Sequence, residues 1–303
     1  MSVDSLNQDV KSQIDNLLLD TKKSSLDIAK TSTETKNSLL IDIANNINES
    51  RSLILSNNEI DLNLLDPKNF SLAFYDRLKL DNPRIDQMIE NINEVIGLDD
   101  PVGKNRFLYE RPNGLKVFKQ SIPLGVICII YESRPNVTSD AASLCLKSGN
   151  SVLLRGGSEC FNTNKILVEI IQKSLIKNNI NQHSVNLVPY TDREVMKYVL
   201  RKDEDIDLVI PRGGEGLIRF VSENSSIPVI KHYKGVCHVY LDSEADLKIA
   251  QDVAINSKIQ RPGVCNAMET LIIHNDISEK FLPLLHKELS LIHISEPTRP
   301  RLI

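Results

Sequence analysis

Cys265 is the residue of this chain whose surroundings most suggest chemistry. It stands in the segment RPGVCNAMETLII, with a helical pattern upstream, a Pro-Gly turn before it and an apolar strand pattern after it. Functional residues often lie on loops that such elements position. Arg261, at the start of the segment, would favour the thiolate form in which cysteine is nucleophilic. The sequence leaves two interpretations open, a catalytic nucleophile and a small buried side chain.

Two further loops combine an arginine with two glycines, each between a predicted strand and a predicted helix. They are Arg155, Gly156 and Gly157 in the first loop, and Arg212, Gly213 and Gly214 in the second. Glycine lets backbone N–H groups approach an anion, and a helix N-terminus adds a favourable dipole. Arginine binds phosphate through two hydrogen bonds. Both loops are candidates for nucleotide binding, and a tight turn with an exposed arginine is the alternative.

Asn136 ends a third loop, YESRPN, which follows the apolar run VICIIY. Its side-chain amide can donate to an oxyanion, or it can serve as an ordinary loop or cap asparagine. The remaining cysteines are predicted to be buried: Cys128, Cys145, Cys160 and Cys237. The odd cysteine count and the absence of CxxC spacing predict neither a disulfide framework nor a zinc site, and no metal site is predicted.

An alternation of strand and helix patterns must position these loops. Apolar residues at three- and four-residue spacing predict two or three helices over residues 4–56, and another over 83–97. Two short strands around Pro112-Asn113-Gly114 predict a hairpin. Four strands then alternate with helices, at 126–131, 151–155, 184–188 and 206–210. This order predicts an α/β fold with a doubly wound parallel sheet, which 227–230 and 237–241 extend, and 268–273 begins a second domain.

Composition narrows the class of protein. The 303 residues are 41% hydrophobic and 25% charged, which is typical of a globular chain with a sizeable core. A net charge of −4 and the absence of tryptophan argue against a nucleic-acid partner. No apolar run reaches the roughly 20 residues of a membrane helix, and the polar N-terminus does not resemble a secretory signal. We therefore expect a cytoplasmic protein without a membrane partner.

Several long motifs, in order, resemble one family. "PLGVICIIYESRPNVTSDAASLCLKSGNSVLLRGGSE", "DLVIPRGGEGL", "GVCHVYLD" and "QRPGVCNAMETLI" are similar to gamma-glutamyl phosphate reductases, which belong to the aldehyde dehydrogenase superfamily. The resemblance implies the NADPH-dependent reduction of L-glutamate 5-phosphate to glutamate 5-semialdehyde, the second step of proline biosynthesis. By motif, Cys265 would be the nucleophile that forms a thioester, Asn136 the oxyanion-hole residue, and both Arg-Gly-Gly loops would lie on the NADP side.

The resemblance also implies a domain plan and partners. Residues 1–105 and 122–253 would bind NADP, the hairpin at 106–121 would mediate homo-oligomerisation, and 254–289 would begin the catalytic domain. The final residues, 290–303, do not resemble the family, whose members are longer, so we expect a truncated chain that is inactive alone. The glutamate 5-kinase of the same pathway is an expected partner.

Two alternatives stay open. One is a hydrolytic aldehyde dehydrogenase, which needs a glutamate to activate water. The Glu-Leu-Gly-Gly motif of hydrolytic aldehyde dehydrogenases would fall near 231–236, where this chain reads KHYKGV without a carboxylate. The other alternative is a nucleotide-binding fragment without catalysis.

Overall fold

The computed structural model describes residues 6–65, 72–231, 235–260, 262 and 266–295. The chain divides into two compact units, Met1–Lys231 and His232–Ile303. This division falls before the predicted boundary at 253/254, so the strand near residue 240 and the helix after it belong to the second unit. The assignment of a cofactor-binding and a catalytic domain to these units stays a prediction.

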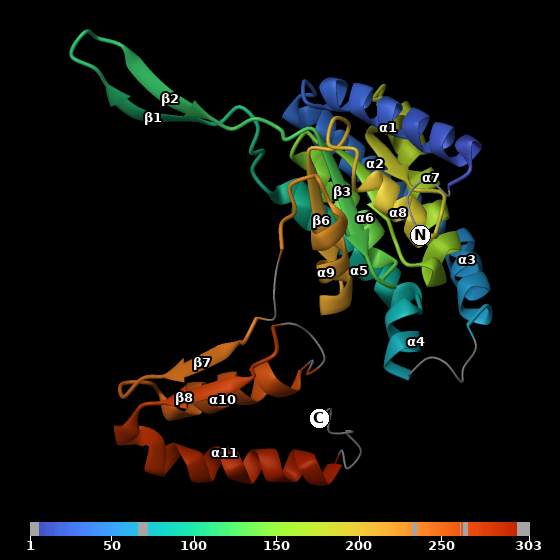
Figure 1. Ribbon diagram of the computed structural model, residues 1–303. Coiled ribbons are helices and arrows are strands. Elements are labelled where there is room, and N and C mark those ends of the chain that lie inside the picture. The colour runs from blue at the N-terminus through green and yellow to red at the C-terminus, as the bar shows by residue number, and fades with distance from the viewer. Residues whose placement is uncertain (1–5, 66–71, 232–234, 261, 263–265, 296–303) are drawn as a thin grey trace. The chain divides into compact units, whose positions relative to one another are not determined.

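A four-stranded parallel sheet with the strand order β5-β4-β3-β6 forms the centre of the first unit (Figure 1). Its strands are β3 (Val126–Tyr131), β4 (Ser151–Arg155), β5 (Val185–Leu187) and β6 (Leu208–Arg212). Every residue of β3 is buried, because helices cover both faces of the sheet. The predicted doubly wound sheet is confirmed.

The helices that follow the strands lie on two different faces. Helices α6 (Asn136–Lys147) and α7 (Phe161–Lys177) pack with β3 residues Ile127 and Ile129 in one core. Helices α8 (Arg193–Val199) and α9 (Glu215–Asn224) pack with Val126 and Cys128 in the other. The chain therefore changes faces after β5, and β6 joins the free side of β3. This reversal creates a topological switch point between the carboxyl ends of β3 and β6.

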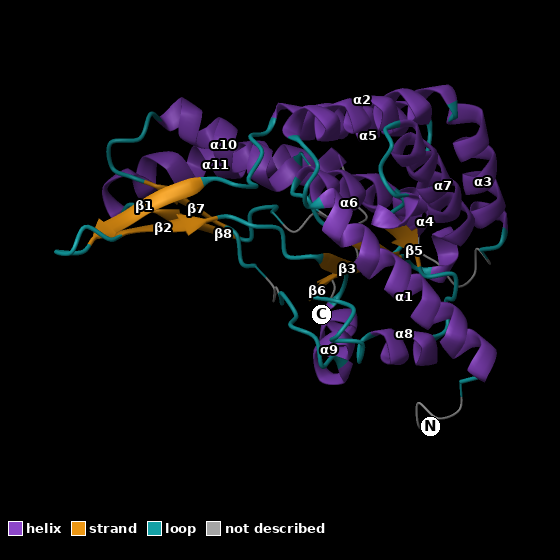
Figure 2. Ribbon diagram, turned by 90° about the horizontal axis from the view of Figure 1, so that it is seen from above, coloured by secondary structure: helices purple, strands orange, loops and turns teal. Residues whose placement is uncertain are grey.

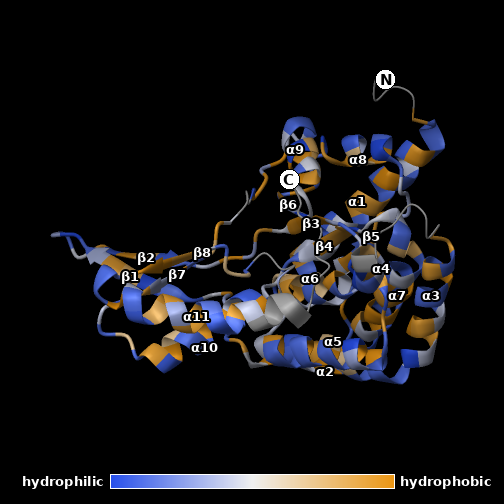
Figure 3. Ribbon diagram, turned by 90° about the horizontal axis from the view of Figure 1, so that it is seen from below, coloured by the Kyte–Doolittle hydropathy of each residue, from blue (hydrophilic) through white to orange (hydrophobic). Residues whose placement is uncertain are grey.

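Within the described ranges 6–65 and 72–97, five helices precede the sheet, as the apolar spacing predicted in outline. They are α1 (Gln8–Ile28), α2 (Thr33–Glu49), α3 (Arg51–Asn63), α4 (Leu72–Leu78) and α5 (Asn82–Gly97). Asp81 caps α5 by accepting from the backbone of Arg84, and proline occupies its first turn. The faces of α2 and α5 that are visible in Figure 3 are mainly hydrophilic. Their apolar sides belong to the same core as residues of α6 and α7. Among the described helices, none has both the length and the apolar character needed to cross a membrane.

The predicted hairpin is present as β1 (Asn105–Glu110) paired antiparallel with β2 (Lys116–Gln120). Gly114 has a φ of 83°, which its turn requires and which other residues rarely adopt. Phe107 and Phe118 contact each other edge to face, yet both stay about half exposed.

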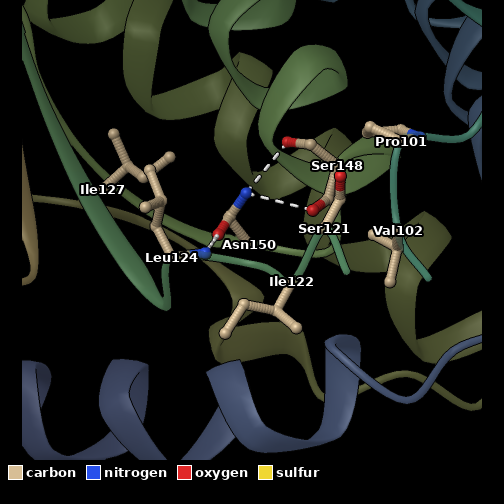
Figure 4. Close-up of a pocket in the computed structure, with 8 residues that line it drawn as sticks. All are labelled: Pro101, Val102, Ser121, Ile122, Leu124, Ile127, Ser148 and Asn150. Carbon is tan, nitrogen blue, oxygen red and sulfur yellow. Dashed lines mark hydrogen bonds between the residues drawn. The ribbon is translucent and has the colours of Figure 1, made fainter. Parts of the chain in front are cut away.

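The base of the hairpin borders a cavity of about 250 Å³ (Figure 4). In its lining, Asn150 accepts from the backbone N–H of Leu124 and donates to Ser148.

The second unit contains a parallel pair, β7 (His238–Leu241) with β8 (Thr270–Ile273), and helices α10 (Leu247–Ile259) and α11 (Asn275–Ser295) (Figure 2). Leu241, Phe281 and Leu285 lie in its core. The expectation that 237–241 extends the central sheet is wrong, because β7 pairs with β8 instead. Residues 227–230 form a single bridge to β6, through Val229, and no strand.

Candidate cofactor and catalytic site

The structure brings the predicted loops together at one edge of the sheet. Arg155 pairs in register with Ile130, and Arg212 with Tyr131, so β4, β3 and β6 end side by side. The loops that follow them are therefore neighbours at the switch point, where open α/β sheets bind ligands. Cys265 lies outside the described residues.

The loop after β6 fits tightly against the loop after β3. A Cβ at Gly213 would lie 2.5 Å from Cδ of Glu132, and the backbone N–H of Glu132 donates to the carbonyl of Arg212. Gly214 is the N-cap of α9 and provides no side-chain cap. The first N–H groups of α9 are thus not covered by a capping side chain, which is the arrangement that favours an anion.

The two glycines of the loop after β4 also lie close to neighbouring side chains. A Cβ at Gly156 would lie 2.1 Å from Nδ2 of Asn164, and a Cβ at Gly157 would lie 2.4 Å from Oε2 of Glu159. The Ser133 hydroxyl donates to Glu159 at 3.1 Å and so joins this loop to the loop after β3. Gly156 is therefore required by close packing, because Asn164 is buried and hydrogen-bonded, whereas the Glu159 carboxyl group beside Gly157 lies at the end of a flexible side chain.

A buried carboxylate from α3 caps the helix that follows this loop. Asp61 accepts from the backbone N–H groups of Asn162, at 3.1 Å, and Thr163, at 2.8 Å. Because Asp61 already places an acidic group at the N-terminus of α7, a phosphate there would meet a like charge. The helix after the second Arg-Gly-Gly loop, α9, has no such side-chain cap, but the carboxyl groups of Glu132, beside Gly213 and Gly214, and of Glu215, in its first turn, bring negative charge close to its N-terminus as well. Sequence reasoning missed Asp61, since about a hundred residues separate it from its partners.

The Arg155 guanidinium has one N–H group that is hydrogen-bonded and another that is not. Its Nη2 donates to the carbonyl of Thr191 at 2.6 Å. Its Nε is buried and has no acceptor among the described residues. Burial lowers the pKa of the guanidinium, and the nearby Glu159 carboxylate opposes this effect. The side chain stays cationic, since arginine does not lose its proton in proteins. A buried N–H without an acceptor is uncommon, and a ligand oxygen would satisfy it.

Asn136 begins α6, but it does not cap the helix. The N-cap residue is Pro135, and Nδ2 of Asn136 donates instead to Asp140 at 3.0 Å. Burial raises the pKa of Asp140, while hydrogen bonds from Asn91 and Asn136 oppose the shift. A side-chain amide carries two N–H groups, so Asn136 keeps one that can donate elsewhere.

Three of the other cysteines are buried, as predicted, and are poor nucleophiles. Burial raises the pKa of Cys128, of Cys145 and of Cys160 to about 12 in each case. Their thiolates are therefore nearly absent at neutral pH. Cys237 is only partly buried, so the prediction of a buried side chain is wrong for this residue.

Comparisons with known proteins agree with these features. Residues 8–302 match the model of the aldehyde dehydrogenase family. Gamma-glutamyl phosphate reductase of Geobacter sp. (strain M21) is 48% identical over 285 residues, which are 94% of this chain and 68% of the relative. The relative of the same name in Sulfurihydrogenibium sp. is 49% identical, over 91% of this chain and 62% of its own length.

Solved structures give the same result. The crystal structure of gamma-glutamyl phosphate reductase from Thermotoga maritima matches with a TM-score of 0.82 and 42% identity, over 91% of this chain and 67% of that one. A probable aldehyde dehydrogenase from Listeria monocytogenes shares the fold at a TM-score of 0.64 and 14% identity, over 92% of this chain and 58% of its own. The chain therefore belongs to the aldehyde dehydrogenase family and, within it, to the gamma-glutamyl phosphate reductases.

Proposed function

We propose that this sequence belongs to an enzyme that carries out the NADPH-dependent reduction of L-glutamate 5-phosphate to L-glutamate 5-semialdehyde and phosphate, a step of proline biosynthesis, and that this chain alone, which spans 68% of a relative's length, is inactive. The observation that carries the proposal is the meeting of both Arg-Gly-Gly loops with the Asn136 loop at the switch point. The relatives at about half identity supply the substrate class by their name.

The residues present fit a nicotinamide dinucleotide. Close packing leaves no room for a side chain at Gly156, the N-terminus of α9 has no side-chain cap, and Arg155 has a buried N–H without an acceptor among the described residues. The α9 N-terminus would hold the pyrophosphate, and Arg155 would approach the adenosine 2′-phosphate. When bound, the reduced nicotinamide supplies a hydride.

In the proposed mechanism the Cys265 thiolate attacks the acyl phosphate carbonyl, and phosphate leaves with the bonding electron pair. Asn136 donates its second amide N–H to the carbonyl oxygen as negative charge develops there. A Cys265 thioester results. The hydride that a bound cofactor supplies would reduce the thioester to the aldehyde, and Cys265 would be released as the thiolate.

The sequence at 231–236 favours this reaction over a hydrolytic dehydrogenase. It reads KHYKGV, and no carboxylate is available there to activate water. A thioester intended for hydride should be protected from activated water, because hydrolysis would consume it without producing aldehyde.

A cofactor titration tests the dinucleotide site. NADPH should bind at least about tenfold more tightly than NADH, because a phosphate-to-arginine pair is worth about 1.4 kcal/mol or more. Arg155→Gln should remove this preference by weakening NADPH binding alone. The control is Arg106→Gln on the exposed hairpin, which should leave both dissociation constants unchanged. Equal binding of the two cofactors by the natural chain would contradict the proposal.

Turnover tests the nucleophile. In the full-length enzyme, Cys265→Ala should abolish phosphate-dependent oxidation of glutamate 5-semialdehyde with NADP, whereas Cys145→Ala should retain it, because Cys145 is buried. Residual turnover in Cys265→Ala would eliminate Cys265 as the nucleophile. Absence of turnover in the full-length enzyme, together with tight NADPH binding, would favour the binding-only alternative.

We also propose that the hairpin at 106–121 mediates homo-oligomerisation. Support comes from apolar side chains that stay about half exposed on it, including Phe107, Leu115 and Phe118. Phe107→Ser with Phe118→Ser should lower the mass measured by light scattering, and an unchanged mass would exclude this role.

A further inference from the structure

A continuous series of buried hydrogen bonds connects the end of β3 to the glycine loop after β4. The Tyr131 hydroxyl and Thr138 Oγ1 are 2.7 Å apart, and Thr138 donates to Oδ1 of Asn164 at 2.8 Å. Nδ2 of Asn164 donates to Sγ of Cys160 at 3.2 Å, and that thiol donates to the carbonyl of Gly157 at 3.5 Å.

The direction of the series follows from proton counting. Thr138 has one hydroxyl proton, which it gives to Asn164, so the Tyr131 hydroxyl must donate to Thr138. Each member then donates once toward Gly157. Tyr131, Thr138, Asn164 and Cys160 are each at most 1% exposed, so water cannot replace a missing partner. The loss of one member would leave its buried neighbours unpaired.

The series of hydrogen bonds ends at the Gly156-Gly157 loop, where a side chain at Gly156 would have no room. Nδ2 of Asn164 lies where a Cβ of Gly156 would stand, and Cε2 of Tyr131 would be 3.1 Å from that Cβ. A backbone hydrogen bond from Arg134 also reaches the Cys160 thiol. Cys160 thus connects the glycine loop to the loop that leads into Asn136.

We propose that Thr138, Asn164 and Cys160 are positioning residues for the dinucleotide site, which they serve by fixing the Gly156-Gly157 loop through the carbonyl of Gly157. They touch neither substrate nor cofactor. Their effect passes through the orientation of the loop backbone and of Arg155 directly before it. The proposal rests on the proposed function, because it takes this loop to be part of the cofactor site.

The test measures the NADPH dissociation constant of the full chain by fluorescence titration, well below the melting temperature. Thr138→Val keeps the shape of the side chain but removes the hydroxyl, and should weaken NADPH binding at least about tenfold. Thr138→Ser restores the hydroxyl and should bind NADPH within about twofold of the natural chain. Ser143→Ala is the control, since it removes a buried hydroxyl on the same helix whose one partner among the described residues is the carbonyl of Ser139.

A second position gives an independent measurement. Cys160→Ala removes the side-chain donor to the carbonyl of Gly157, which the backbone N–H of Cys160 also reaches at 3.3 Å, and should weaken NADPH binding, whereas Cys160→Ser keeps a side-chain donor and should weaken it less. Cys145→Ala is the matched control, because Cys145 is also buried and lies away from the loop, in the second half of α6.

The outcomes separate the two proposals. If these residues had only a structural role, the variants and the controls would both have lower melting temperatures. Their NADPH dissociation constants would then equal that of the natural chain. Natural affinity in Thr138→Val or Cys160→Ala would overturn the positioning role, and so would equal weakening in Ser143→Ala or Cys145→Ala. A natural chain that binds neither NADPH nor NADH would contradict the cofactor site itself and, with it, this proposal.

Discussion

The carboxyl group of Glu132 fills the space that a side chain at Gly213 would need. A Cβ at Gly213 would stand 2.5 Å from Cδ and 2.7 Å from Oε1 of Glu132. The two residues follow adjacent strands, and their contact closes the switch point between β3 and β6. The contact fixes the approach to the N-terminus of α9, where we place the pyrophosphate.

Gly213→Ala should therefore weaken NADPH binding at least about tenfold, because the new methyl group would itself stand in the approach of the pyrophosphate to the N-terminus of α9. Glu132 is exposed and can rotate into solvent, so the free energy of unfolding should fall by less than about 1 kcal/mol. Gly216→Ala is the control, since a Cβ there meets nothing within 4 Å. It should stabilise α9 by about 0.5–1 kcal/mol and leave affinity unchanged. Equal affinities in the two variants would contradict this account.

Asp61→Ala should destabilise the chain strongly. The substitution leaves the backbone N–H groups of Asn162 and Thr163 without their acceptor, and Asp61 is only 2% exposed. Unpaired buried donors cost about 1–3 kcal/mol each, so we expect a loss of roughly 3 kcal/mol in urea denaturation. Asp81→Ala removes an ordinary cap from α5 and should cost only about 1 kcal/mol. A similar loss of stability in Asp61→Ala and Asp81→Ala would show that Asp61 contributes no more than an ordinary helix cap.

The sequence predicted the central sheet because local patterns determine it. VICIIY has no polar position, which indicates a strand covered on both faces, and β3 is buried throughout. β7 differs, since His238 and Tyr240 are exposed while Leu241 is buried. This period-two pattern is typical of a strand covered on one face and could have separated β7 from the central sheet. Pro228 interrupts 227–230 and has no N–H to donate to a ladder.

Other parts of the site depend on distant contacts and could not be predicted. Asp61 caps a helix about a hundred residues away, and Thr138 bonds to Asn164 across two helices. Neither pair has a local pattern, because polar residues such as these read as ordinary surface positions until folding brings them together. The motif resemblance located the loops, but the reason for each glycine required the neighbouring side chains.

Thiol reactivity should separate the cysteines. At pH 8 a thiol with a pKa of about 12 is ionised to about one part in ten thousand, and Cys128, Cys145 and Cys160 have such values. Iodoacetamide should therefore leave these three unmodified in the native chain and label Cys265 first, as peptide mass spectrometry would show. In urea all five cysteines should react. Labelling of Cys160 as fast as Cys265 in the native chain would contradict both the burial and the nucleophile assignment.

The carboxyl group that holds Asn136 should give stability a distinctive pH dependence. Burial raises the pKa of Asp140 above its ordinary value of 3.8. In the window between these two values the folded chain binds more protons than the unfolded chain, so stability falls as pH rises through it. Asp140→Asn removes this titration. The free energy of unfolding of Asp140→Asn minus that of the natural chain should thus increase with pH above about 3.8.

Asp42 provides a control of opposite sign. A hydrogen bond from Lys177 lowers the pKa of Asp42. The contribution of Asp42 to the free energy of unfolding is therefore fully present above pH 3.8 and is lost as the pH falls below that value. Urea denaturation from pH 3 to 7 should show the Asp42→Asn difference decreasing as pH rises and the Asp140→Asn difference increasing. The part of each lost interaction that does not depend on protonation changes the difference by a constant, so only the slopes report the carboxyl groups. A flat or falling Asp140→Asn difference would mean that Asp140 is not held in a desolvated site beside Asn136, and the positioning of the oxyanion donor would then need another explanation.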